Sequence, residues 1–448
     1  MWVSDDWTAT TVEFAAESTS DNSASRTAHV ARNCSRNCPE SAAGAALLSV
    51  HGPGRDLLML RALALLSAML VALTGCGGTS PKASQTTPSA TSTDDPSSAP
   101  LTNVVPTVRD AAASMHVVTH VSRSGVNDGG THVSTSVFVP KSNPPAGGYP
   151  IVALAHQTTG LSAECAPSQS DTLLGLAPTV EGLLRAGYVV TVPDYQGLGK
   201  PAVTDDEYNH YYPYLDSATA GYNVIDAVRA THATVPQTST SWVALGFREG
   251  GQAAWAANEL TDGYGSDLKF FGSASISPVA EVSGLADAAQ NGTLNDAQKV
   301  VYIRYLAAIG REYQYDIELD DYRRGAAGEQ WDAMLSCRPD APTAPAQITA
   351  ADLRPTDEKA LAALRAYLKK TNLPQGPALA PMLVIHGDTD PVSPGAWTDR
   401  ALDAACKMGD SIAIQKRPGP QTDPLAALAW IGDRFAGAPA PNDCGGRR

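Results

Sequence analysis

The chain has 448 residues, of which 43% are hydrophobic and 17% are charged, and this composition is typical of a globular protein rather than a disordered or fibrous one. Acidic residues outnumber basic ones, 46 to 32, so the formal net charge is −14. No stripe of Lys and Arg stands out along the chain, which argues against nucleic acid as a partner, because binding to a phosphate backbone needs such a stripe.

The first hundred residues suggest export. Residues 1–58 are rich in Ser, Ala, Thr and Asn without sustained periodicity, so we expect a disordered or non-native leader with Met59 as the true start. Residues 59–75 contain a basic residue followed by about a dozen apolar residues, the length of a signal-peptide core and too short for a membrane span. Residues 76–100 are rich in Ser, Thr and Pro, which predicts a flexible tether.

Cys76 is the candidate for lipid attachment. The residues Leu73-Thr74-Gly75-Cys76 resemble a bacterial lipobox, and this implies cleavage before the cysteine and a diacylglycerol on its sulfur. The alternative is a signal anchor followed by an unmodified cysteine. We therefore expect an exported protein, anchored by lipidated Cys76 to the outer face of the cytoplasmic membrane.

Four cysteines follow Cys76, an even number in an oxidising setting, and this predicts two disulfides. Among the three possible connectivities we predict Cys165 with Cys337 and Cys406 with Cys444.

From about residue 114, short β-branched runs alternate with amphipathic segments, which favours a doubly wound, mostly parallel α/β sheet with helices on both faces. The domain is expected to cover 101–440. Strands are predicted at 134–140, 149–156, 188–195, 241–247, 269–277, 380–388 and 411–417. Helices are predicted at 172–187, 218–233, 250–260, 396–409 and 424–437. About a hundred residues, 279–379, interrupt this alternation with further helices, and an insertion of this kind predicts a lid over the sheet.

The segment around residue 248 has the pattern of a nucleophile elbow. Gly246-Phe247-Arg248-Glu249-Gly250 lies between a hydrophobic strand and a helix of small residues, where such an elbow has G-x-S-x-G. The alternative is an ordinary strand-to-helix turn.

With this elbow, four further blocks carry a resemblance to the secretory lipase family, the group similar to fungal lipase A. The blocks are His156–Gly160, Cys165-Ala-Pro, Pro193–Gly199 and His386–Val392, and their order and spacing match the family over nearly all of residues 101–440. The resemblance implies an α/β-hydrolase fold with a helical lid.

The resemblance also implies the catalytic roles. Residue 248 would be the nucleophile, Asp390 the triad acid, and a His in the loop before the last helix the general base. The loop containing Gln157 and Thr158 would lend oxyanion-hole donors, as would the backbone N–H of Glu249.

Three departures from this pattern predict an inactive enzyme. Arg248 cannot act as a nucleophile, because its guanidinium only donates hydrogen bonds. No histidine follows Asp390, since the last one in the chain is His386, which we interpret as a satisfied structural residue. Gln157 stands where the family commonly has glycine, which puts the oxyanion hole in doubt. Glu249 would need a different turn to serve as a carboxylate nucleophile.

Further expectations concern the remnant of the triad. We hypothesise that Arg248 reaches into the vacated space and pairs with Asp390. Asp388 and Asp390 lack a third ligand, so no metal is expected, and no cofactor motif is present.

Three functions stay open at this point. The first is a catalytically dead lipase homologue that binds acyl chains or a fatty acid in an apolar cleft, or a protein partner. The second is a working ester hydrolase with Ser393 or Thr158 as nucleophile, although neither has a base beside it in sequence. The third is a structural envelope protein in which the cleft has closed.

Overall fold

The computed structural model describes residues 95–200, 211–337 and 344–447. The segments predicted to be a leader, a signal peptide and most of a tether, with Cys76, lie outside these ranges. In the described ranges, no helix combines the length and the apolar character that a membrane crossing needs.

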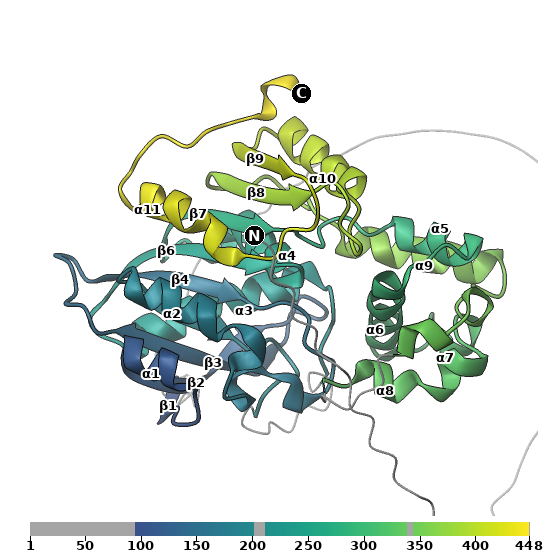
Figure 1. Cartoon of the computed structure of the whole chain (residues 1–448), viewed down its shortest axis with the longest axis horizontal. Coiled ribbons are helices and arrows are strands. Elements are labelled where there is room, and N and C mark those ends of the chain that lie inside the picture. The colour runs from purple at the N-terminus through teal and green to yellow at the C-terminus, as the bar shows by residue number, and fades with distance from the viewer. Residues whose placement is uncertain (1–94, 201–210, 338–343, 448) are drawn as a thin grey trace, which may run out of the picture. The chain divides into compact units, whose positions relative to one another are not determined.

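A nine-stranded sheet forms the centre of the fold, in the order β1-β2-β3-β5-β4-β6-β7-β8-β9 (Figure 1). The first four strands of that order pair antiparallel, and the rest, from β5 to β9, pair parallel. The strands are β1 (Ser97–Pro100), β2 (Ala112–Arg123), β3 (Gly130–Pro140), β4 (Tyr149–Ala155), β5 (Val189–Pro193), β6 (Thr238–Phe247), β7 (Lys269–Ile276), β8 (Met382–Gly387) and β9 (Ile412–Arg417). The predicted α/β-hydrolase fold class is confirmed.

Helices cover both faces of the sheet because buried strand residues alternate between two apolar clusters. In β4, Ile151 and Ala153 pack in the cluster that contains α3 and α4, whereas Val152 and Leu154 pack in the cluster of α1, α2 and α11. The helices outside the lid are α1 (Pro106–Ala111), α2 (Ala177–Arg185), α3 (Ser217–Thr234), α4 (Glu249–Tyr264), α10 (Gly395–Met408) and α11 (Leu428–Phe435).

The predicted lid is a set of helices between β7 and β8, which Figure 1 shows gathered beside the sheet. They are α5 (Gly284–Asn291), α6 (Asp296–Glu312), α7 (Gly325–Glu329), α8 (Trp331–Leu335) and α9 (Glu358–Thr371). Helix α6 begins with a capping box, in which the Asn295 side chain accepts from the backbone of Gln298 and the Gln298 side chain accepts from the backbone of Asn295.

Two boundaries of the sequence interpretation were wrong. The folded part begins before residue 101, because β1 pairs antiparallel with β2 from Ser97 onward. It also extends past residue 440, to the short 3-10 helix η9 (Cys444–Gly446). Strands β1 and β2 themselves were not predicted. All four residues of β1 are exposed and β2 is only partly buried, so neither has the continuous apolar run on which the prediction relied.

Two helices are shorter than predicted. In the predicted helix 172–187, Leu173, Leu174 and Gly175 all have positive φ, and the α-helical part starts only at Ala177. The predicted helix 424–437 is divided into a 3-10 turn, η8 (Pro424–Ala427), and α11.

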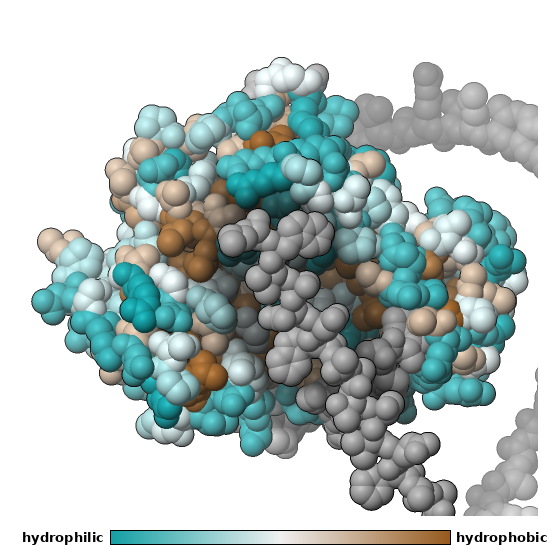
Figure 2. Space-filling model, viewed as in Figure 1, coloured by the Kyte–Doolittle hydropathy of each residue, from teal (hydrophilic) through white to brown (hydrophobic). Residues whose placement is uncertain are grey.

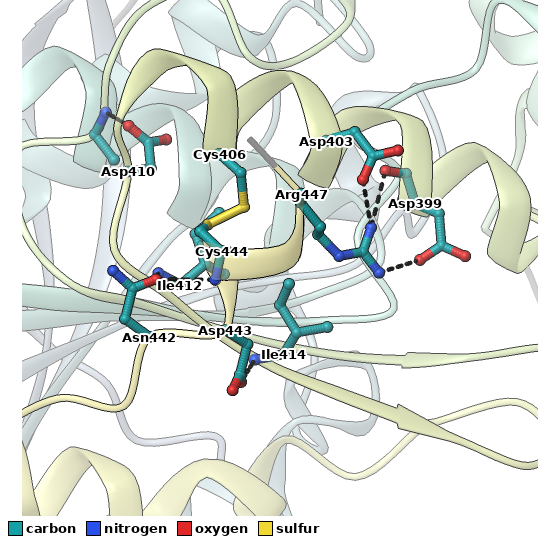
Figure 3. Close-up of a disulfide and its surroundings, with 11 residues drawn as sticks. Asp399, Asp403, Cys406, Asp410, Ile412, Ile414, Asn442, Asp443, Cys444 and Arg447 are labelled. Carbon is teal, nitrogen blue, oxygen red and sulfur yellow. Dashed lines mark hydrogen bonds and ion pairs between the residues drawn. A yellow bond between two sulfur atoms is a disulfide. The ribbon is translucent and has the colours of Figure 1, made fainter.

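The structure contains two disulfides, Cys165–Cys337 and Cys406–Cys444, which is the predicted pairing. The first joins the loop after β4 to the segment that follows α8. The second, shown in Figure 3, joins α10 to residues 442–447. Arg447 holds this segment further through ion pairs with Asp399 and Asp403.

The surface offers few large apolar side chains. Among the described residues, those exposed are Tyr315, Leu379 and Met408. On the face shown in Figure 2 the body is mostly hydrophilic, with small separate apolar patches. An apolar binding site is therefore to be sought in an internal cavity.

Candidate active site

The turn between β6 and α4 has the geometry of a nucleophile elbow. Arg248 sits at its apex with φ 58° and ψ −118°, in a region that costs a non-glycine residue about 1–3 kcal/mol. A Cβ at Gly246 would lie 1.9 Å from the Gly250 carbonyl oxygen, and one at Gly250 would lie 2.0 Å from that of Ala155. Glycine is therefore required on both sides of the apex, and the residue-248 side chain points out above the sheet.

Arg248 is paired with the triad acid, as the sequence hypothesis expected. Its Nη1 donates a hydrogen bond to Asp390 Oδ1. The same oxygen accepts from the backbone N–H groups of Val392 at 2.9 Å and Ser393 at 3.0 Å. The Asp390 side chain is only 2% exposed and that of Arg248 16%, so this is an enclosed ion pair. The position that a serine and an imidazole would share is thus occupied by a guanidinium.

Among the residues that the structure describes, no histidine takes the place of the missing base. The loop between β9 and η8 contains none, and His386 is buried in β8 with its Nε2 3.7 Å from Asp399 Oδ1, beyond hydrogen-bond range. Burial lowers the pKa of His386. The carboxylate of Asp399 and a backbone hydrogen bond with Gly387 act in the opposite direction, and the structural role of His386 stays a prediction.

Next to the ion pair, the structure brings together Glu249 and Thr158, which are 91 positions apart in sequence. The Thr158 hydroxyl donates to Glu249 Oε2 at 2.8 Å and lies 3.1 Å from the Tyr214 hydroxyl. Tyr212 donates its hydroxyl proton to Glu249 Oε1. Glu249 is 1% exposed, and this burial raises its pKa to about 7. A carboxyl group that is half ionised near neutral pH is therefore in contact with a hydroxyl.

A cavity of about 260 Å³ opens above the elbow. Its polar lining contains two arginines, Arg248 and Arg304, the second of which comes from lid helix α6. The full lining is Gln157, Thr158, Tyr214, Arg248, Val279, Ala297, Val300, Val301, Arg304 and Val392. The predicted elbow and oxyanion-loop residues therefore meet at one site, although Ser393, which is 2% exposed, does not line it.

Two sets of contacts hold the lid over this cavity, one at the start of α6 and one after α8. The Asn295 side chain donates to the Pro391 carbonyl at 2.9 Å, next to Asp390. In the second set, Leu161 N–H donates to the Leu335 carbonyl at 2.8 Å, beside the Cys165–Cys337 disulfide. The loop after β4 and the lid are thus joined covalently as well as by hydrogen bonds.

Sequence reasoning missed the contribution of α6. Arg304 donates from Nε to the Met334 carbonyl at 3.0 Å and from Nη2 to the Ser336 carbonyl at 3.3 Å. A usable signal was present, because Arg304 is the one charged residue in the otherwise apolar run 300–309. A lone charge on a buried helix face indicates a partner or a functional role.

Neither aspartate after β8 is arranged for metal binding. Asp388 accepts from Gly419 N–H at 2.9 Å and so fixes the loop after β9. In the part of the chain that the structure describes, no group of three His, Cys, Asp or Glu residues is placed to hold a metal ion.

The fold, the elbow and the lid define the chain as a lipase-like α/β-hydrolase. Within this class, the model of the secretory lipase family matches residues 165–317 of the chain.

Two curated lipases are similar to this chain in sequence. Lipase A of Arthroderma benhamiae is 26% identical over 306 residues, which cover 62% of this chain and 58% of that protein. Lipase 10 of Candida albicans is 26% identical over 327 residues, which cover 63% of this chain and 64% of that protein. The chain thus spans about three fifths of the length of these curated relatives.

Solved structures share the fold. The closed state of Candida antarctica lipase A superposes with a TM-score of 0.61 at 15% identity, covering 78% of this chain and 84% of that one. The rice cell wall degrading esterase LipA from Xanthomonas oryzae superposes with a TM-score of 0.55 at 19% identity, covering 76% of this chain and 95% of that one.

Proposed function

We propose that this protein is a catalytically silent relative of the secretory lipases, which uses the cavity under the lid to bind an acyl ligand. The observation that carries the proposal is the enclosed ion pair between Arg248 and Asp390. It fills the place of the nucleophile and of its base, while the cavity above it stays open. A structural protein with a collapsed cleft is disfavoured by that open volume.

A second candidate function, ester hydrolysis, is favoured by one observation that the sequence did not reveal. Thr158 lines the cavity and donates its hydroxyl proton to Glu249, a base whose pKa is raised to about 7 by burial. In this scheme Glu249 takes the proton as Thr158 Oγ1 attacks the ester carbonyl. It then returns the proton to the leaving alkoxide, and water hydrolyses the acyl-threonine.

Hydrolysis of short and long nitrophenyl esters by the purified chain separates the two candidates. We expect turnover no faster than in buffer, and no change in Arg248→Ala, because the triad lacks both nucleophile and base. Turnover that disappears in Thr158→Ala and Glu249→Gln, survives in Thr158→Ser and rises with pH through about 7 would establish the second candidate instead.

We further propose that the protein is exported and anchored through a lipid on Cys76. The match to the secretory lipase family model supports export, and the apolar run that ends at Cys76 supports lipidation. Metabolic labelling with an alkyne-tagged fatty acid is expected to mark the wild type, and to leave Cys76→Ser unmarked and released from the membrane fraction. Label retained by Cys76→Ser would contradict the anchor.

A further inference from the structure

The cavity wall combines two cationic groups with a hydrocarbon surface. Arg248 and Arg304 are the only charged residues that the structure describes in the lining of this cavity. Its apolar lining residues are Val279, Ala297, Val300, Val301 and Val392. Both guanidinium groups lower the pKa of the hydroxyl of Tyr214, a third lining residue, so both lie near it. We propose that the cavity selects ligands with a carboxylate head, held between Arg248 of the elbow and Arg304 of α6, with the hydrocarbon part against the valines. This proposal rests on the proposed function and specifies its ligand.

The balance of charge around the cavity favours an anion. Asp390 neutralises Arg248. Arg304 has no carboxylate within ion-pair distance among the described residues, and the nearby Glu249 is only partly ionised at neutral pH, because burial raises its pKa to about 7. One positive charge is therefore left uncompensated in an apolar wall, where an unpaired charge is costly. A ligand carboxylate would supply the missing counter-charge.

The structural contacts of Arg304 leave donors for such a ligand. Its bonds to the carbonyls of Met334 and Ser336 use Nε and Nη2, as in the capping of the last turn of α8. Among the described residues, Nη1 has no hydrogen-bond partner and the residue lines the cavity. A neutral capping side chain would serve α8 without the cost of a buried charge. The guanidinium, in contrast, can hold α8 with one edge and a carboxylate with the other.

The size of the cavity limits the ligand to a short chain. Its volume of about 260 Å³ lies just below the roughly 300–1,000 Å³ of typical ligand pockets. Octanoate is a suitable probe because it joins a carboxylate to a compact hydrocarbon tail. 1-Octanol has the same tail with a neutral head, so the pair isolates the contribution of the charge.

Calorimetric titration of the full chain with both probes tests the inference. We expect octanoate to bind at least about 10-fold more tightly than 1-octanol, since a charge-assisted hydrogen bond contributes about 1.5–3 kcal/mol. Arg304→Gln should remove this preference without weakening 1-octanol, whereas Arg304→Lys should keep part of it. Arg365→Gln, which changes an exposed arginine on α9, is the matched control and should leave both affinities unchanged.

The outcomes are distinguishable. Equal binding of octanoate and 1-octanol, or an unaltered preference in a folded Arg304→Gln, would overturn the carboxylate site and leave acyl binding intact. An equal loss of both affinities in Arg304→Gln would show that Arg304 acts only through the lid, which also overturns it. Absence of binding of either probe to the wild type would overturn the proposed function itself, and the carboxylate site with it.

Discussion

Arg248→Met is expected to lower the free energy of unfolding by about 3 kcal/mol, because it leaves the enclosed carboxylate of Asp390 without its cation. Breaking a buried pair from one side typically costs about 3–5 kcal/mol. The lower end applies here, since the two backbone N–H groups of Val392 and Ser393 still hold the carboxylate. Urea denaturation followed by circular dichroism would measure the change.

A double-mutant cycle with Asp390→Asn assigns the loss to the ion pair. In the Asp390→Asn background, Arg248→Met leaves no unpaired carboxylate. It should therefore lower the free energy of unfolding by less than about 1 kcal/mol. Arg248 also lies over the ring of Phe247, with its guanidinium carbon 5.3 Å from the ring centroid. The same cost in both backgrounds would show that this packing, and not the pairing with Asp390, explains the effect.

Between pH 6.5 and about 8.5 the protein is expected to lose stability, on the order of 3–4 kcal/mol in total. Burial raises the pKa of Asp194, Glu249 and Glu259 to about 7, and that of Glu312 to about 8. In this range the unfolded chain has already released these protons while the folded chain still holds them. The free energy of unfolding therefore falls as pH rises, until the folded groups have also ionised.

The buried histidines act mainly at lower pH. Burial lowers the pKa of His120 and His386, and that of His156 to about 4. They therefore raise stability as pH increases through the unfolded pKa of about 6.5, and this gain levels off about one pH unit above it, where it offsets a small part of the loss. The urea concentration at which half of the protein is unfolded, measured from pH 6.5 to 8.5, checks the prediction.

Glu312 is expected to supply the largest share of the loss, so Glu312→Gln should flatten the profile. Glu318→Gln, at an exposed position a few residues further along the chain, should not alter it. If the stability of the wild type does not change between pH 6.5 and 8.5, these carboxyl groups are solvated more fully than their surroundings indicate.

The central strands and the elbow were predictable because their signals are local. The parallel strands β4, β5 and β8 are apolar runs buried along almost their whole length, and the elbow is a short pattern of glycines between a strand and a helix. The pairing of Arg248 with Asp390 followed from the two positions that the family pattern assigns. In contrast, β2 is partly exposed along its length, so it lacks a continuous apolar run. No local sequence pattern indicates that it pairs with β3.

The rest of the site depends on contacts that are distant in sequence. The Thr158–Glu249 pair forms only when the loop after β4 packs against the start of α4. Arg304 reaches the cavity only because α6 docks over it, which is determined by the packing of the whole lid. The hydrophobic pattern of α6 indicates a buried helix, but it does not reveal the surface on which that helix lies.

Residues 442–447, which the Cys406–Cys444 disulfide fixes, cover the edge of the sheet (Figure 3). Strand β9 is the last in the sheet, and an uncovered edge strand would offer its backbone groups to a second protein chain. Here the outward N–H groups of Ile412 and Ile414 donate to the side chains of Asn442 and Asp443, and the Ile412 carbonyl accepts from Asp443 N–H. The opposite edge, β1, has only four residues and ends in Pro100. Strand-to-strand aggregation is therefore blocked at one edge by a covalently held cover and limited at the other by the shortness of the strand.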